Sequence, residues 1–401
     1  MYRDATIAVV VPAYNEAGFV GDVIDEIPSF VDRAYVIDDG STDDTWSEIQ
    51  QHARRRNDGH EGVFEELIVP IRHETNRGVG GAIKTGYLRA RAEEIDVTGV
   101  LGGDDQMNPD VLTRYIDPIV EGRADYTKGN RFARASHWDA MPRFRFLGNV
   151  ILSYLTKIAS GYWDVMDSQN GYTAISLDAL EATDIEGMYE YYGYCNDLLV
   201  RLNVANVRVA DVPRSAEYAY TDGWKSHINY QEYIPRVSLM LARSFAWRLR
   251  RKYLLQNYHP TVALYAVGTT ALSAGIVGLV RSLLGKSDTD TGTWLLLTTL
   301  GSLTILGATE SDRQENSHLA IDVTPDDEAT RATELGPESA SGTRAPEETE
   351  TVPRSAPDDV NALQSDGHRP KEQANGNNEQ EQANGDSEQE PHDESMVVDN
   401  Q

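Results

Sequence analysis

Short β-rich runs alternate with helix-like patterns over the first hundred residues, and this alternation sets the fold class. Runs rich in Val, Ile and Leu predict strands at residues 6–11, 34–37, 66–71 and 98–101. Helical periodicity between them predicts helices near residues 18–26, 44–56 and 79–94. Because strand–helix–strand connections cross over the sheet, the strands should lie mostly parallel in an α/β fold. In an open parallel sheet, ligands bind beyond the carboxyl ends of the strands.

Polar and acidic residues follow the first two predicted strands. Pro12, Tyr14 and Glu16 come after the first strand, and Asp38 and Asp39 follow the second. Two adjacent carboxylates at a strand end can accept hydrogen bonds from the ribose or the base of a nucleotide. A loop that continues into a helix N-cap explains either run equally well. The sequence therefore offers a nucleotide site at this edge without requiring one.

A glycine-rich segment, NRGVGGAIKTG at residues 76–86, opens the third predicted helix. Ile83 stands where a dinucleotide-binding G-x-G-x-x-G motif needs its last glycine, and it also precedes Lys84 where a P-loop needs glycine. Neither motif is therefore present. Glycines at a helix start let an anion approach the backbone, which would place Lys84 beside a phosphate. They also permit tight helix packing, and both alternatives stay open.

The fourth polar run, GGDDQMNPD at residues 102–110, follows the strand at residues 98–101. A hard divalent cation that bridges phosphates needs carboxylate oxygens but few protein ligands, so Asp104 and Asp105 could hold one. The alternative is a turn followed by a helix that begins at Pro109. The run thus predicts either a cation site or an ordinary strand-to-helix turn.

The chain changes character near residue 230. A helical pattern over residues 231–258 predicts a basic amphipathic helix on a membrane surface, and its basic residues are Arg236, Arg243, Arg248, Arg250, Arg251 and Lys252. Residues 261–280 are uncharged and long enough to cross a bilayer, whereas residues 292–308 are uncharged but shorter. We predict a two-helix transmembrane hairpin over residues 259–309 with a marginal second span. The basic cluster places residues 1–230 in the cytoplasm, and two spans return the C-terminal tail to the same side.

Residues 310–401 contain 24 acidic and six basic residues and are rich in Glu, Gln, Asn, Ser and Pro. Such a segment cannot bury enough apolar surface to offset its ordering entropy, so we predict a disordered acidic tail. No motif residue lies beyond Ser311, and we expect truncation there to leave activity intact.

Composition excludes some classes of function. The net charge of −28 repels phosphate backbones, so nucleic acid is not an expected partner. Cys195 is the single cysteine and cannot form an internal disulfide, which fits a reducing compartment. The apolar run at residues 7–11 is too short for a secretory signal. Only seven of the 36 basic residues are lysine, which together with the acidic excess suggests adaptation to high salt.

Four motifs in chain order resemble those of family 2 glycosyltransferases, above all the dolichyl-phosphate mannose and glucose synthases. They are VVVPAYNE at residues 9–16, DDGSTDDT at 38–45, NRGVGGAIKTG at 76–86 and DSQNGY at 167–172. The resemblance covers residues 1–230 and continues into the paired C-terminal spans. It implies a Rossmann-like GT-A fold, followed here by transmembrane helices and the tail, and an inverting transfer from a UDP- or GDP-linked sugar.

The resemblance also implies roles for individual residues. The nucleotide sugar would be held by Pro12, Tyr14, Glu16, Asp38, Asp39, Lys84, Asp104 and Gln106. The family's D-x-D-x-Q motif has Gly102 in place of its first Asp here. A Mg²⁺ or Mn²⁺ ion would therefore rest on Asp104 and Gln106, with Asp105 as a substitute ligand.

On the acceptor side, the resemblance places Asp167, Gln169 and Asn170 in a loop that faces the acceptor. Arg131, and Lys225 with Ser226, are candidates to hold an acceptor phosphate. Asp197 would orient the acceptor beside the catalytic Asp104 and Lys225, although a structural carboxylate at a helix N-terminus explains it too.

The expected activity is transfer of one hexose to dolichyl or polyprenyl phosphate at the cytoplasmic face of the cell membrane, in support of protein glycosylation. The alternative enzyme extends a saccharide already on a lipid carrier. A sugar nucleotidyltransferase is disfavoured because residues 12–16 lack a glycine-rich basic loop, and a membrane scaffold because the strand-end carboxylates are intact.

Overall fold

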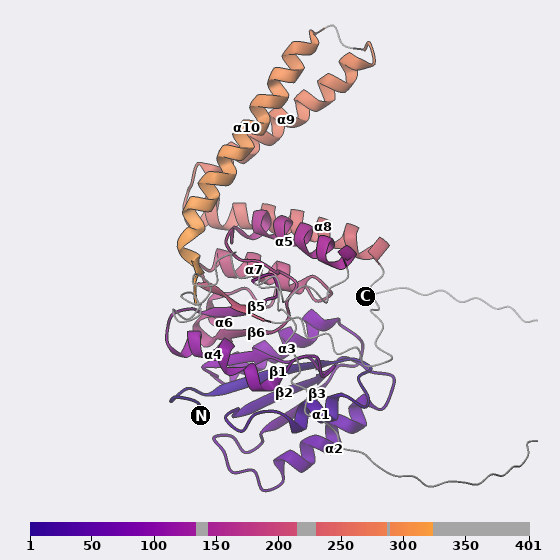
Figure 1. The fold of residues 1–401 in the computed structure, drawn as a ribbon, viewed down its shortest axis with the longest axis vertical. Coiled ribbons are helices and arrows are strands. Elements are labelled where there is room, and N and C mark those ends of the chain that lie inside the picture. Colours follow the sequence, from indigo (N-terminus) through magenta and orange to yellow (C-terminus); the bar gives the residue numbers. More distant parts are fainter. Residues whose placement is uncertain (134–142, 215–229, 287–288, 324–401) are drawn as a thin grey trace, which may run out of the picture. The chain divides into compact units, whose positions relative to one another are not determined.

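The computed structural model describes residues 1–133, 143–214, 230–286 and 289–323 (Figure 1). Its sheet has the strand order β3-β2-β1-β4-β6-β5-β7-β8. The strands are β1 (Ile7–Ala13), β2 (Arg33–Asp38), β3 (Ile68–Arg72), β4 (Val97–Val100), β5 (Tyr126–Asn130), β6 (Thr173–Ser176), β7 (Val209–Pro213) and β8 (Ala320–Ile321). The helices are α1 (Val20–Asp25), α2 (Thr45–Asn57), α3 (Val79–Ala92), α4 (Thr113–Val120), α5 (Arg143–Ser160), α6 (Leu177–Ala182), α7 (Tyr194–Val204), α8 (Tyr230–Arg250), α9 (Thr261–Leu283) and α10 (Thr291–Asn316).

The sheet is mostly parallel, as the sequence predicts. Strands β1 to β4 run parallel, β5, β7 and β8 run parallel, and β6 is antiparallel to both β4 and β5. Ala13 is in register with Asp38, and Val10 with Val100. The segments that follow β1, β2 and β4 therefore meet at one edge of the sheet.

Strand β1 is apolar on both faces because helices cover both. Ile7, Val9 and Val11 pack with α1, α2 and α4, whereas Ala8 and Val10 pack with α3 and α7. A continuous apolar run is typical of a parallel strand that is buried on both sides. Helix α3 comes close at Gly86, where a Cβ atom would lie 2.4 Å from Val10 Cγ1. This packing fixes the direction in which the strand ends.

Helices α9 and α10 form a hairpin with glycines at the contact (Figure 1). A Cβ atom at Gly301 would lie 2.4 Å from the backbone nitrogen of Leu272. Both helices are long and apolar enough to cross a membrane. The uncharged stretch at residues 292–308 suggests a short second helix, but α10 is longer than that stretch. It runs for 26 residues and continues past Glu310 to Asn316.

The chain returns to the sheet after the hairpin. A short 3₁₀ turn, η4 (Ser317–Leu319), leads into β8, where Ala320 pairs with Val209 of β7. The predicted start of the tail at residue 310 is therefore wrong, because the fold continues to residue 323. Residues 324–401 lie outside the described part of the chain.

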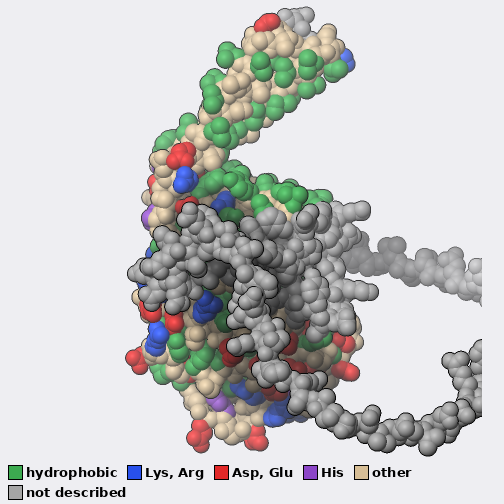
Figure 2. All heavy atoms as spheres, in the orientation of Figure 1, with side chains coloured by type: hydrophobic (Ala, Val, Ile, Leu, Met, Phe, Trp, Pro, Cys, Tyr) green, Lys and Arg blue, Asp and Glu red, His purple; other side chains and the backbone are tan. Residues whose placement is uncertain are grey.

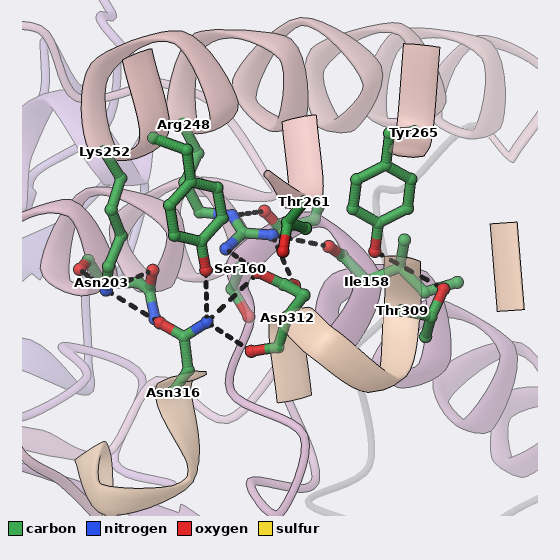
Figure 3. Close-up of polar contacts among 12 residues, drawn as sticks. Ile158, Ser160, Asn203, Arg248, Lys252, Thr261, Tyr265, Thr309, Asp312 and Asn316 are labelled. Atoms are coloured by element: carbon green, nitrogen blue, oxygen red, sulfur yellow. Dashed lines mark hydrogen bonds and ion pairs between the residues drawn. The ribbon is translucent and has the colours of Figure 1, made fainter. Parts of the chain in front are cut away.

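A buried polar cluster joins the C-terminal end of α10 to the ends of α5 and α7 and to the segment from α8 into the turn that follows it (Figure 3). Arg248 binds both carboxylate oxygens of Asp312, at 2.9 and 2.8 Å, and both residues are 0% exposed. Arg248 also donates to the carbonyl of Ala159 at the end of α5. Lys252, in the π-helical turn η3 (Arg251–Gln256), donates to Asn203 of α7 and to Asn316.

This cluster corrects the prediction of a basic membrane face over residues 231–258. Arg248 and Lys252 point into the protein, because the last turns of α5 and α7 present carbonyl oxygens that need donors. Arg243, Arg250 and Arg251 are exposed. The helix is thus amphipathic, but two of its six cations are structural.

Candidate active site

The loops after β1 and β2 are fastened to each other by their polar residues. The backbone N–H of Asn15 donates to Ser41 Oγ at 3.0 Å, and that of Thr42 donates to Asn15 Oδ1 at 2.9 Å. The N–H of Glu16 donates to Thr45 Oγ1 at 2.8 Å. These bonds explain much of both motifs structurally. They also present Tyr14, which is exposed, beyond the end of β1.

Asp38 and Asp39, both predicted to bind the nucleotide, are held differently. Asp38 is 0% exposed, accepts a hydrogen bond from the N–H of Ser41 and lies 3.0 Å from Arg72 Nε. Its carboxylate therefore shapes the loop. Asp39 Oδ1 accepts from the N–H of Arg77 at 2.9 Å and contacts His73 Nδ1 at 2.7 Å. Asp39 is thus oriented by a histidine that the sequence did not single out.

Glu16 and Asp104 come together across the edge of the sheet. Burial and the negative charges of Asp104 and Asp43 raise the pKa of Glu16 to about 7. Burial likewise raises the pKa of Asp104, while the N–H of Gln106 and the positive charge of Arg214 oppose that shift. Burial and both of these carboxylates also raise the pKa of Tyr192. Carboxylates with raised pKa values in a strand-end site are typical of a functional site.

The donor chemistry here fits a hard divalent cation that is held by few protein ligands. The described residues contain no group of three or more His, Cys, Asp and Glu side chains that could hold a metal. Asp104, however, is a carboxylate without an ion-pair partner in the described chain, and Glu16 repels it. Oxygen ligands from one carboxylate and from substrate phosphates are what Mg²⁺ commonly uses.

Gly102, where the family has an Asp, is explained by the position of Asp104. A Cβ atom at Gly102 would lie 2.6 Å from Asp104 Oδ1, and one at Gly103 would lie 2.9 Å from the carbonyl oxygen of Pro12. A side chain at residue 102 would thus displace the Asp104 carboxylate.

The glycine-rich start of α3 serves packing. A Cβ atom would lie 2.6 Å from the carbonyl oxygen of Glu190 at Gly78, and 2.5 Å from that of Tyr189 at Gly80. The N–H of Gly81 donates to Glu190 O at 2.9 Å, so a protein carbonyl already binds the helix start. Of the two alternatives that the sequence left open, the structure supports tight packing.

Lys84, predicted to lie beside the diphosphate, is paired within the protein. Its Nζ donates to Glu190 Oε1 at 2.8 Å, and Arg77 Nη2 binds the same oxygen at 2.9 Å. The hydrogen bond from Lys84 is the main cause that holds the pKa of Glu190 below its usual value. Glu190 is therefore a residue that the sequence missed, and it pairs with two cations at this edge.

The predicted acceptor side is built around Asp167. Arg131 binds it bidentately, at 2.8 Å from Nε and 2.7 Å from Nη2. Burial alone would raise the pKa of Asp167, but the hydrogen bonds and charge of Arg131 outweigh it and lower the pKa. Asn170 donates to the same carboxylate at 3.3 Å. Beneath them, Lys128 is buried and paired with Asp211 at 2.9 Å.

Gln169 and Asp197 are also committed to bonds inside the domain. Gln169 binds Asn196 of α7, and it accepts from Tyr233 of α8 at 2.7 Å. Asp197 is 2% exposed and accepts hydrogen bonds from three groups, namely Tyr189 N–H, Arg201 Nε and Ser244 Oγ. This geometry supports the structural alternative for Asp197. Lys225 and Ser226 lie outside the described residues, so their roles stay predictions.

Comparison with known proteins identifies the class of enzyme. Residues 8–183 match the family described as "Glycosyl transferase family 2". The chain therefore carries a family 2 glycosyltransferase domain with a GT-A-like α/β fold, and the protein is a glycosyltransferase. The resemblance deduced from the four motifs is confirmed.

Relatives from archaea carry dolichyl-phosphate names. The UDP-N-acetylglucosamine–dolichyl-phosphate N-acetylglucosaminyltransferase of Methanococcus voltae is 28% identical over 60% of this chain and 98% of its own. The dolichyl-phosphate hexose transferase of Haloferax volcanii is 28% identical over 53% of this chain and 83% of its own. A crystal structure of Mycobacterium tuberculosis glucosyl-3-phosphoglycerate synthase, with Mn²⁺, UDP and glucosyl-3-phosphoglycerate, is 21% identical with a TM-score of 0.43, and covers 61% of this chain and 80% of its own.

Proposed function

We propose that this glycosyltransferase moves one hexose, with inversion, from a UDP- or GDP-linked donor to dolichyl or another polyprenyl phosphate. The observation that carries the proposal is the pair of unneutralised carboxylates, Glu16 and Asp104, at the carboxyl edge of the sheet. The names of the archaeal relatives support the acceptor, because both include dolichyl phosphate. Transfer to this lipid would serve protein glycosylation.

On the donor side, each residue has a distinct task in this proposal. Asp39, fixed by His73, accepts hydrogen bonds from the nucleoside, and the exposed ring of Tyr14 offers it a stacking surface. A Mg²⁺ or Mn²⁺ ion on Asp104, with Gln106 and Asp105 beside it, would stabilise the negative charge that develops on the departing diphosphate. Glu16, with a pKa of about 7, exists partly protonated near neutral pH and lowers the repulsion of that charge.

The acceptor side favours a phosphate over a sugar hydroxyl. A hydroxyl must lose a proton during transfer and needs a base, whereas a phosphate oxygen is already anionic. Asp167 and Asp197, the predicted acceptor-side carboxylates, are both engaged by arginine, with Arg131 and Arg201 respectively. Neither is free to act as a base, which supports transfer to a lipid phosphate over extension of a lipid-linked saccharide.

Exposed apolar helices support a membrane-surface location. Among residues 147–160 of α5, the exposed side chains are uncharged, and the large ones are Leu147, Ile151, Tyr154, Leu155 and Ile158. Figure 2 shows hydrophobic side chains along α9 and α10 and over α5 and α8. Exposed Arg243, Arg250 and Arg251 would attract anionic headgroups. We propose a two-span membrane protein whose catalytic domain and tail are cytoplasmic.

One assay tests the proposal. Membranes that contain the full chain are incubated at high salt with a panel of UDP- and GDP-sugars and with polyprenyl phosphates, and lipid products are identified by mass. Membranes with Asp104→Ala are the matched control. We expect a polyprenyl phosphate that carries one hexose. A product with further sugars on a lipid diphosphate would favour the alternative enzyme, and no product from any pair would refute both.

A further inference from the structure

The loop that carries Asp104 is held by residues from the far half of the sheet. Tyr172, just before β6, donates its phenol O–H to the carbonyl oxygen of Asn108 at 3.0 Å. Arg214, directly after β7, donates from Nη2 to the carbonyl oxygen of Gln106 at 2.8 Å. Two side chains thus bind the backbone of the loop on the C-terminal side of Asp104.

The guanidinium of Arg214 is itself held in place. Its Cζ atom lies 5.2 Å from the ring centroid of Tyr172, and that ring stacks on Tyr115 with a centroid distance of 4.1 Å. The backbone N–H of Arg214 donates to Asn130 O, at the end of β5. Arginine has five N–H donors in a fixed plane, and one bond to Gln106 leaves most of them for another acceptor.

The charge of Arg214 distinguishes it from other cations at this edge. Lys84 is paired with Glu190 at 2.8 Å and Arg131 with Asp167 at 2.7 Å. Across the described residues, Arg214 has no carboxylate within ion-pair distance. It is nevertheless close enough to Asp104 to stabilise the ionised carboxylate. Its positive charge is therefore available where Glu16 and Asp104 would repel an anionic ligand.

We propose that Arg214 positions the diphosphate of the donor beside Asp104. The loop lacks one carboxylate of the family motif, because Gly102 stands in place of the first Asp. The inference rests on the proposed nucleotide-sugar donor. With one carboxylate fewer, the loop binds a divalent cation more weakly. Part of the positive charge that stabilises the diphosphate must therefore come from a protein side chain. A planar guanidinium binds phosphate oxygens bidentately, and one that Gln106 and Tyr172 already orient needs little rearrangement.

Binding without divalent cation tests this role directly. Full-length protein, purified in detergent at high salt with a chelator, is titrated with UDP and GDP by calorimetry and with uridine and guanosine by ligand-observed NMR. For Arg214→Gln we expect roughly tenfold or greater loss of affinity for the nucleoside diphosphate that the wild type binds. Affinity for the matching nucleoside should change less than about twofold. Arg214→Lys, which keeps the charge, should recover part of the loss.

The matched control is Arg208→Gln. Arg208 directly precedes the same strand, β7, but pairs with Asp125 at 2.6 Å, and its loss should change neither affinity. Equal losses for nucleoside and diphosphate in Arg214→Gln would show that Arg214 only supports the loop, and an unchanged diphosphate affinity would also overturn the proposal. If the wild type binds neither UDP nor GDP, even with Mn²⁺, the proposed donor is wrong and this role falls with it.

Discussion

Two groups of carboxylates in this protein have opposite surroundings. Glu16 and Asp104 lie beyond the carboxyl ends of the parallel strands. They have no ion-pair partner in the described residues, and their pKa values are raised. Three other carboxylates are almost fully buried and each binds an arginine: Asp167 with Arg131, Asp197 with Arg201, and Asp312 with Arg248. We call the first group the open carboxylates and the second the paired carboxylates.

The difference separates function from stability. A buried ion pair whose members satisfy each other presents no charge to a ligand, and removing one partner leaves the other uncompensated. A carboxylate without a partner raises the energy of the free protein and binds a cation or a donor group more strongly. We therefore expect changes to paired carboxylates to alter folding, and changes to open carboxylates to alter transfer.

The largest effect should come from truncation after Ser311, which the sequence alone predicts to be harmless but which the structure shows to cut into the fold. This change removes Asp312 from the fully buried Arg248 and removes β8 from the sheet. An uncompensated buried charge costs about 3–5 kcal/mol, a large share of the stability of a typical domain. We expect no folded protein, measured by detergent solubility and thermal unfolding at high salt. Truncation after Val323 should retain wild-type activity, and a stable, active chain ending at Ser311 would remove Asp312 from the paired group.

Asp167→Ala should destabilise the domain by about 3 kcal/mol or more, because it leaves the guanidinium of Arg131 without its bidentate partner. Thermal unfolding of the full chain measures the change. Asp164→Ala is the control, because Asp164 is exposed in the same loop. The free energy of unfolding of this variant should lie within about 0.5 kcal/mol of that of the wild type. Unchanged stability with reduced transfer would move Asp167 to the open group.

Asp104→Ala should lower transfer at least about hundredfold and leave the unfolding temperature unchanged or slightly higher. The loss follows from removing the carboxylate that would hold a cation at the diphosphate. Turnover of the nucleotide sugar and thermal unfolding are measured on the same sample. Asp105→Ala should lower the rate of transfer by less than about tenfold. A larger loss in Asp105→Ala than in Asp104→Ala would assign the cation to Asp105.

The smallest effect concerns Glu16 and pH. Its pKa is about 7 in the folded protein against 4.5 as the ordinary value, so the folded state holds this proton more tightly. Ionisation of Glu16 therefore lowers the free energy of unfolding as the pH rises from about 4.5 through 7. With a chelator present, Glu16→Gln should lose fewer degrees of Tm than wild type between pH 5 and pH 8, a difference of roughly a few degrees. Glu26→Gln, exposed after α1, should behave as wild type, and an identical slope in Glu16→Gln would contradict the raised pKa.

The sequence by itself determined the periodic features. Alternating strand and helix patterns gave a mostly parallel sheet, and the run before Pro12 is apolar on both faces because helices cover both. The motifs also indicated the family and the edge of the sheet that carries the site. These features depend on residues close together in the chain, where spacing alone fixes which face a side chain occupies.

Only the tertiary structure decided which charged groups are free. Asp167 and Lys84 match family motifs as well as Asp104 does, yet their partners Arg131 and Glu190 lie 36 and 106 residues away in the chain. The glycines of residues 76–86 likewise fit an anion site until the carbonyls of Tyr189 and Glu190 are found against them. Whether a charge is neutralised depends on atoms within about 4 Å, and the fold alone brings such distant atoms together.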